Sequence, residues 1–168
     1  ENSDWLPDYA LFCALRDQFG TDDWRTWEDT IRNREKDALI SWEKKLKKEI
    51  AACIELQWQL AKSYGELRTK AKKLQISLVG DLPFYLSVQS PLVWANQDIF
   101  EISKDGKMRF VSGIPDTPLA HFGRQVWGHP LYRWGDKEQE GKVVSFWKMR
   151  LRYVATLFDV IRFDHAKA

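Results

Sequence analysis

The sequence contains few cysteines and no long apolar run, and each shortage excludes a class of protein. Only Cys13 and Cys53, among 168 residues, are cysteines, which is too few for the disulfide framework of a small secreted domain. Both fall on apolar positions of helical patterns, so we expect reduced side chains in the core. No stretch approaches the roughly 18 consecutive apolar residues of a membrane span, and the first four residues lack the features of a secretory signal. We therefore expect no membrane partner and a cytoplasmic protein, or a plastid protein in a plant or alga.

The chain also lacks an excess of charge of one sign. It has 26 basic and 24 acidic residues, for a formal net charge of +2. The most basic run, residues 44–48, is interrupted by Leu46 and followed by Glu49, which is typical of a solvated helix face. We expect no nucleic-acid partner.

Tryptophan, in contrast, is abundant, with nine in 168 residues. Most of these side chains should lie in the core, but flat aromatic rings also stack on the apolar faces of sugar rings. Trp94, Trp127 and Trp134 fall outside the helical patterns. These three are therefore the candidates for contact with a ligand.

The first half of the chain reads as helical. Apolar spacing predicts a helix from about Leu6 to Phe19, with Ser3 or Asp4 as its cap, Pro7 in its first turn and Gly20 as its stop. A second, long amphipathic helix is predicted over residues 37–75, with Gly65 as the place for a break. A coiled coil is the alternative for such spacing, but we favour packing on a sheet because a β-rich segment follows.

The middle of the chain predicts one strand and a long insertion. Residues 76–83 form a short β-type run that contains Asp81 and ends at Pro83. About 60 residues without helical periodicity follow, far more than the usual 2 to 6 of a βα connection. Within them, residues 99–103 and 107–111 flank an Asp-Gly turn and predict a β-hairpin, and residues 112–130 read as a surface loop.

The last part predicts a helix from Gly141 to Leu157, with Val144, Trp147 and Leu151 on its apolar face, and then a buried strand over residues 159–164. A strand, a connection that contains a helix, and a second strand form the parallel β/α repeat. In barrels of such repeats the active site lies at the carboxyl ends of the strands. Asp81 and Asp164 both fall at such ends, so we expect two strands to deliver carboxylates to one face.

Several segments, in order along the chain, resemble the 4-α-glucanotransferases, also called amylomaltases or disproportionating enzymes, of glycoside hydrolase family 77. The segments are Trp5-Leu6-Pro7-Asp8-Tyr9-Ala10, Val79-Gly80-Asp81-Leu82-Pro83, Val93-Trp94-Ala95-Asn96, Trp127-Gly128-His129-Pro130-Leu131-Tyr132 and Ile161-Arg162-Phe163-Asp164-His165. The resemblance implies an α/β fold, here a partial (β/α)8 TIM barrel with a long loop and β-hairpin insertion. It divides the chain into a helical part (1–75), a strand with the inserted lid (76–140) and the nucleophile strand with its helix (141–168).

The resemblance also implies an activity, in which a segment of an α-1,4-glucan moves to an acceptor with retention and without a metal or organic cofactor. Asp164 corresponds to the catalytic nucleophile, and Arg162 would hold that carboxylate in position. Asp81 and His165 correspond to residues that line the sugar subsite, and Trp127 lies beside the mobile loop over the acceptor side. Each has a structural alternative: an ion pair for Arg162 and Asp164, a turn cap for Asp81, packing for Trp127 and a rim position for His165.

Departures from the family qualify this reading. Residues 166–168 replace the usual Phe-Arg-Gly, and residues 114–119 replace the usual Pro-Pro-Asp-Tyr-Phe-Ser, so acceptor preferences do not transfer. A full barrel takes about 250 residues, and retention needs a second carboxyl group about 5 Å from the nucleophile. In the family that glutamate lies on a later strand, so we expect this chain to be a central segment of a longer enzyme. The alternative is a catalytically inactive, carbohydrate-binding or structural remnant of a barrel.

Overall fold

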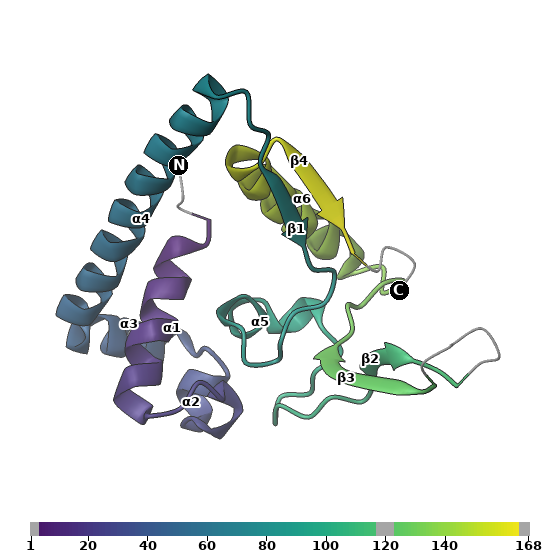
Figure 1. Ribbon diagram of the computed structural model, residues 1–168. Coiled ribbons are helices and arrows are strands. Elements are labelled where there is room, and N and C mark those ends of the chain that lie inside the picture. The colour runs from purple at the N-terminus through teal and green to yellow at the C-terminus, as the bar shows by residue number, and fades with distance from the viewer. Residues whose placement is uncertain (1–3, 117–122, 165–168) are drawn as a thin grey trace.

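The computed structural model describes residues 4–116 and 123–164. The first half of this part is helical and the second half contains the strands (Figure 1). One parallel strand pair, β1 and β4, lies beside helix α6. One antiparallel pair, β2 and β3, lies beyond the carboxyl ends of β1 and β4. The candidate site residues belong to the strand pairs, so the helices matter here for how they support them.

The first helix, α1 (Leu6–Phe19), confirms the prediction of its bounds and its stop at Gly20. Its cap was predicted wrongly, because Trp5 occupies the N-cap position and makes no side-chain cap hydrogen bond. Ser3 lies outside the described residues. One face of α1 is fully buried and consists of Ala10, Leu11, Phe12, Ala14 and Leu15.

Two further helices replace the single long helix predicted over residues 37–75. After the short helices η1 (Trp24–Thr26) and α2 (Asp29–Arg32), the chain forms α3 (Lys36–Lys45) and α4 (Lys47–Lys73). The break falls at Leu46 and not at Gly65, which lies inside α4. Leu46 is 5% exposed, so the residue at the break belongs to the core.

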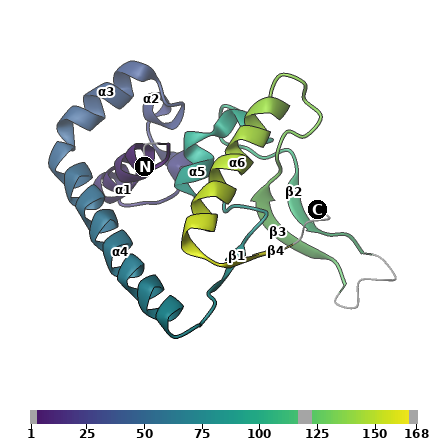
Figure 2. The ribbon, with the colours of Figure 1, turned by 90° about the horizontal axis from the view of Figure 1, so that it is seen from above.

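Helix α4 packs mainly on α1, so the prediction that it packs on a sheet was wrong. It runs along the outside of the molecule (Figure 2) and has no fully buried residue. Near its carboxyl end it reaches the turn between α6 and β4, where Tyr64 Oη donates to the carbonyl of Leu157 and Arg68 pairs with Asp159 at 2.9 Å. Packing on α1 covers the apolar pattern only in part, because five large apolar side chains of α4 are exposed: Ile54, Leu56, Trp58, Leu60 and Leu67.

The parallel repeat predicted from the sequence is present, but the prediction of a buried second strand was wrong, because none of residues 160–163 is buried. Strand β1 (Val79–Leu82) pairs in parallel with β4 (Val160–Phe163), and α6 (Glu140–Leu157) lies in the connection between them. A close packing contact fixes the identity of Gly80, because a Cβ atom there would lie 2.2 Å from a ring atom of Phe158. The strand therefore carries a glycine where the aromatic ring crosses it.

The insertion between β1 and α6 is more regular than predicted. It contains α5 (Pro91–Ala95), η2 (Gln97–Ile99), β2 (Val111–Ile114) and β3 (Gln125–Pro130). Strands β2 and β3 pair antiparallel, so the prediction of an irregular surface loop over residues 112–130 was wrong. No propensity signal revealed this pairing, because Gly113 and Gly128 weaken the strand pattern and the two partners are not adjacent in sequence.

The hairpin predicted over residues 99–111 is reduced to a tight turn. Ser103 and Lys107 are joined across the Asp-Gly turn by a backbone hydrogen bond of 2.9 Å, and one isolated bridge joins Ile102 to Met108. The preceding residues instead pair with the segment after β3, where Phe100 forms a bridge with Tyr132. The local turn signal was correct, but tertiary pairing competed for the strand partner.

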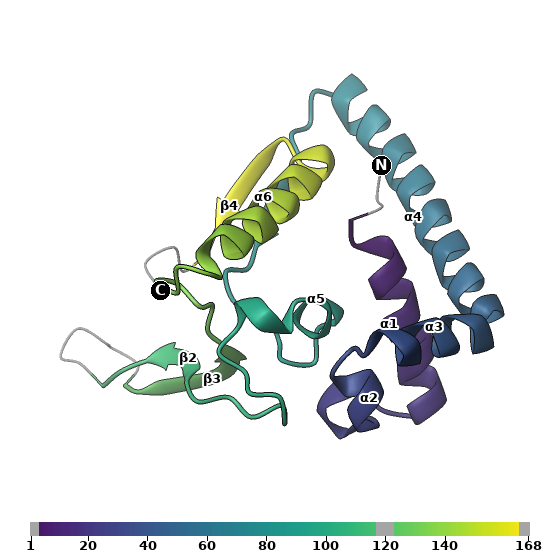
Figure 3. The same cartoon turned by 180° about the vertical axis from the view of Figure 1, so that it is seen from behind.

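The buried face of α6 is shifted from the predicted one. Val144 is 38% exposed, and the buried residues are Val143, Phe146, Trp147 and Arg150. These four follow the helical spacing i, i+3, i+4 and i+7, but an arginine in the series hides it from a search for apolar residues alone. Figure 3 shows this helix lying over the strand pair.

Aromatic side chains form much of the core. Trp24 and Trp94 are fully buried, and their indole N–H groups donate to the carbonyls of Val88 at 2.6 Å and Ile31 at 3.2 Å. Trp94 lies in α5 and belongs to the core, so it is not a ligand-contact candidate. Trp134, in contrast, is 48% exposed.

Both cysteines are free and half-buried, on α1 and α4. The expected cytoplasmic setting stays a prediction.

Within residues 4–116 and 123–164, no helix combines the length and the apolar character that crossing a membrane requires.

We expect Trp24→Ala to lower the free energy of unfolding by about 3–5 kcal/mol, because it opens a cavity and leaves the Val88 carbonyl without its donor. Trp58→Ala is the matched control: its side chain is 58% exposed, and the expected change is within about 0.5 kcal/mol. Urea unfolding followed by circular dichroism measures both. Equal losses in the two variants would contradict this description of the core.

Candidate active site

Three charged side chains meet at the carboxyl ends of β1 and β4. Asp81 is the register partner of Arg162, and paired residues of neighbouring parallel strands point to the same face. Asp164 follows Arg162 by two residues, so the alternation of a strand brings it to that face as well. The structure thus confirms that the two strands deliver Asp81 and Asp164 to one place, with Arg162 between them.

The arginine contacts the two carboxylates through different nitrogen atoms. Its Nη1 donates to Asp81 Oδ2 at 2.7 Å, and its Nη2 lies 3.1 Å from Asp164 Oδ1. The guanidinium is rigid and planar, so engaging both carboxylates fixes their relative orientation. The exposed fractions of the side chains are 54% for Asp81, 60% for Arg162 and 37% for Asp164.

Exposure decides what these ion pairs contribute. Pairs open to water add about 0–1 kcal/mol to stability, so the arrangement does little to hold the fold. It does present carboxylates in a defined orientation to a ligand that approaches the strand ends. An oriented, accessible carboxylate is the group required for nucleophilic attack on a sugar.

Trp127 lies on β3, at the side of the molecule toward which β1 and β4 point (Figure 1). It is half-buried, and its indole N–H donates to Gln125 Oε1 at 2.9 Å. The next residue, Gly128, has a φ of +75°, a left-handed conformation that favours glycine and explains the Trp-Gly pair. The centroid of the Trp127 indole lies 6.2 Å from that of the ring of Tyr85, which follows Asp81 by four residues. Trp127 is thus linked to the β1 end through Tyr85.

Tyr85 is a candidate that the sequence reasoning missed. It follows Phe84 in the loop that leaves β1, and burial raises the pKa of its hydroxyl. The signal was an aromatic pair directly after Asp81-Leu82-Pro83, at a strand end that had already been marked as functional. His165, the fifth predicted site residue, lies outside the described residues.

An aromatic layer lies beneath the strand ends. The rings of Phe84 and Trp147 are 5.0 Å apart, and those of Trp147 and Phe163 are 5.4 Å apart. Phe84 follows β1 and Phe163 ends β4, so helix α6 touches both strand ends through one indole.

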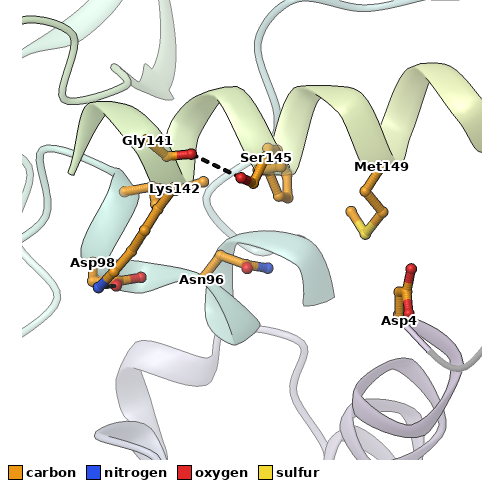
Figure 4. A pocket seen from close by; sticks show the side chains of 9 residues that line it. Asp4, Asn96, Asp98, Gly141, Lys142, Ser145 and Met149 are labelled. Carbon is orange, nitrogen blue, oxygen red and sulfur yellow. Dashed lines mark hydrogen bonds and ion pairs between the residues drawn. The ribbon is translucent and has the colours of Figure 1, made fainter.

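A depression of the surface, about 470 Å³, lies elsewhere, between α6 and the α5–η2 segment (Figure 4). Lys142 and Asp98 form an ion pair of 2.5 Å across one end of it, and Ser145 Oγ donates to the carbonyl of Gly141 at 2.8 Å. None of the strand-end residues lines it. We therefore place the candidate site at the strand ends, where the charged groups converge.

No group of three or more histidine, cysteine or carboxylate side chains is positioned to hold a metal ion among residues 4–116 and 123–164.

A parallel β/α repeat with carboxylates at its strand ends defines the class of α/β enzymes whose active site lies at the carboxyl face of the sheet. The chain belongs to glycoside hydrolase family 77, the 4-alpha-glucanotransferase family, whose profile matches residues 1–168.

Known proteins extend this match. The chain is 38% identical to a 4-alpha-glucanotransferase of Aquifex aeolicus over 165 residues, which is 98% of the chain and 33% of that protein. It is also 38% identical to a 4-alpha-glucanotransferase of Thermus thermophilus, over 96% of the chain and 32% of the relative. A solved amylomaltase from Streptococcus agalactiae, in complex with acarbose, superposes with a TM-score of 0.86 at 29% identity, over 96% of the chain and 32% of that structure. The chain thus spans about a third of the length of these relatives.

Proposed function

We propose that this chain carries the nucleophile region of a 4-α-glucanotransferase, which moves a segment of an α-1,4-glucan to an acceptor glucose or glucan. The proposal rests on the position of Asp164, which lies just beyond the end of β4. Its Oδ1 is 3.1 Å from Nη2 of Arg162. The family match over the whole chain and the names of its relatives support the reaction class.

The proposed fold of the complete protein is a (β/α)8 barrel in which β1 and β4 are neighbouring strands. The parallel pairing and the intervening α6 support this, and the β2–β3 pair is then an insertion at the strand ends. Residues 1–75 form its helical part, residues 76–140 the strand with the inserted lid, and residues 141–168 the helix with the nucleophile strand.

In the proposed reaction the Asp164 carboxylate attacks the anomeric carbon of the donor glucan. The bond from that carbon to the leaving glycosidic oxygen breaks, and a second carboxyl group gives its proton to the oxygen. A hydroxyl of the acceptor sugar then attacks the anomeric carbon of the covalent glycosyl-enzyme and gives its proton to the second group. The bond between that carbon and Asp164 breaks, which frees the Asp164 carboxylate and restores the α configuration.

Asp81 and Arg162 have supporting roles in this scheme. Arg162 keeps the nucleophile aimed, since its two nitrogens hold Asp81 and Asp164 at once. Asp81 accepts a hydrogen bond from the Arg162 guanidinium, and an ionised carboxylate has no proton to donate. We therefore assign Asp81 to sugar contact and to holding Arg162, not to proton donation. The acid/base carboxyl group belongs, in this proposal, to the two thirds of the family's length that this chain does not match.

Trp127 and Tyr85 are assigned to sugar stacking on the acceptor side. Their rings lie within 6.2 Å and Trp127 is half-buried, so one ring supports the other while a face stays available. His165 is assigned to the sugar subsite from its place directly after the nucleophile. The product of the reaction from maltotriose would be glucose and a series of longer maltodextrins.

We expect Asp164→Asn, in the complete gene product, to lower kcat/KM for maltotriose disproportionation by at least about 150-fold, or about 3 kcal/mol, because the covalent step has no substitute nucleophile. Chromatography of the products measures it. Asp37→Asn, which changes an exposed aspartate of α3, is the matched control and should stay within about threefold. Activity of Asp164→Asn within tenfold of the unaltered protein would remove Asp164 from the nucleophile role.

Trp127→Ala should raise KM for maltotriose about fivefold, since loss of one stacking contact costs about 1 kcal/mol. The control is Trp58→Ala, an exposed tryptophan of α4 to which no sugar contact is assigned. Initial rates over a range of maltotriose concentrations separate KM from kcat. An unchanged KM in Trp127→Ala would assign this side chain to packing.

A further inference from the structure

Arg150 occupies a position where a core side chain is expected. It lies on the buried stripe of α6, with an exposed fraction of 6%, beside Phe146 and Trp147. Its guanidinium stacks over the Trp147 ring at 4.5 Å. A charge in such a place is costly unless its donors are used, so the partners of this guanidinium are informative.

Those partners are oxygen atoms at and near the end of β1. Arg150 Nη2 donates to the carbonyl of Pro83 at 2.7 Å, and Nη1 donates to Tyr132 Oη at 3.2 Å. Tyr132 Oη in turn donates to the carbonyl of Phe84 at 3.0 Å. Two consecutive carbonyls of the chain that leaves β1 are therefore held by one network from α6.

The charge state of the network follows from its burial. Among residues 4–116 and 123–164, no salt bridge joins Arg150 to a carboxylate. Burial raises the pKa of Tyr132 to about 12, even though the nearby guanidinium lowers it, and burial lowers the pKa of Arg150. At neutral pH the phenol therefore keeps its proton, and it both accepts from Arg150 and donates to Phe84.

The same network also reaches β4. The Trp147 ring under the guanidinium contacts the ring of Phe163 at 5.4 Å, and Phe163 is the residue before Asp164. Pro83 lies two residues after Asp81. Arg150 is thus connected to the exits of both strands that carry the ion-paired carboxylates.

We propose that Arg150 is a positioning residue for the transfer reaction: together with Tyr132 and Trp147 it clamps the carboxyl ends of β1 and β4 and fixes the spacing of Asp81, Arg162 and Asp164. This proposal rests on the proposed function of the strand-end site. It assigns to a buried arginine on the supporting helix a part in catalysis that does not involve contact with the sugar. An apolar side chain of similar length would fill the space but would leave the Pro83 carbonyl without its donor.

A clamp and a purely structural arginine predict different kinetics. If Arg150 only adds stability, its loss lowers Tm and leaves the rate of the folded fraction unchanged. If it holds the strand ends, its loss lowers kcat well below Tm and changes KM little, because displacement of a reacting group by about 1 Å costs up to about 100-fold in rate.

The test uses the complete gene product with Arg150→Lys and Arg150→Met, assayed on maltotriose at a temperature at least 15 °C below each Tm. Lysine keeps the charge but is a point donor that does not span Pro83 and Tyr132 together as the guanidinium fork does. We expect kcat to fall about tenfold or more in both variants, with KM within about threefold. Tyr132→Phe, which removes one link and little volume, should lower kcat in the same direction and serves if the Arg150 variants do not fold.

Arg133→Met is the matched control. Arg133 also donates to two backbone carbonyls, those of Phe100 at 2.8 Å and Ile102 at 3.3 Å, but neither belongs to β1, to β4 or to the residues that directly follow them. It should lower Tm without lowering kcat more than about twofold. A kcat of Arg150→Lys that matches the control would overturn the clamp.

Hydrogen exchange separates failure of the clamp from failure of the proposed function. In Arg150→Met, and not in Arg133→Met, the amides of residues 79–82, 84 and 160–163 should exchange faster. An unaltered protein that produces no maltodextrins would sink the proposed function, and the exchange result would then decide the clamp alone. Unchanged exchange at both strands would reject it.

Discussion

The register of β1 against β4 is the constraint on which the site depends. Side chains alternate along a strand, so a slip of one residue would place Asp81 on the face opposite Arg162. The register is fixed at the other end of the pair by Asp159. Its Oδ2 accepts from the amide of Leu78 at 2.9 Å, and its own amide donates to the carbonyl of Leu78 at 2.9 Å. The Leu78 amide, and then Arg68, lower the pKa of the Asp159 carboxyl.

Two helices, α4 and α6, hold the short strand pair β1–β4 in place. Each strand has only four residues, and Val79 and Val160 at their starts are 64% and 53% exposed. Arg68 brings α4 to the start of the pair through Asp159, while α6 covers its end through Trp147. An ion pair therefore holds the amino-terminal end of the strand pair, and aromatic packing holds its carboxyl end.

Local signals in the sequence predicted those parts that local physics controls. The bounds of α1 and α6, the parallel repeat and the place of Asp81, Arg162 and Asp164 followed from periodicity and from the family motifs. The break at Leu46, the pairing of β2 with β3 and the burial of Arg150 depend on partners distant in sequence, which spacing alone does not specify. Trp94 illustrates the same limit, because only packing distinguishes a core tryptophan from one that meets a ligand.

The placement of one guanidinium between two carboxylates also determines the electrostatic character of the strand ends. Their formal charges leave an excess of one negative charge at a surface open to water. In the proposed reaction, such a field would favour the positive charge that develops on the sugar during glycosidic bond cleavage. The same charge would disfavour an anionic donor, such as a phosphorylated sugar, relative to an uncharged glucan.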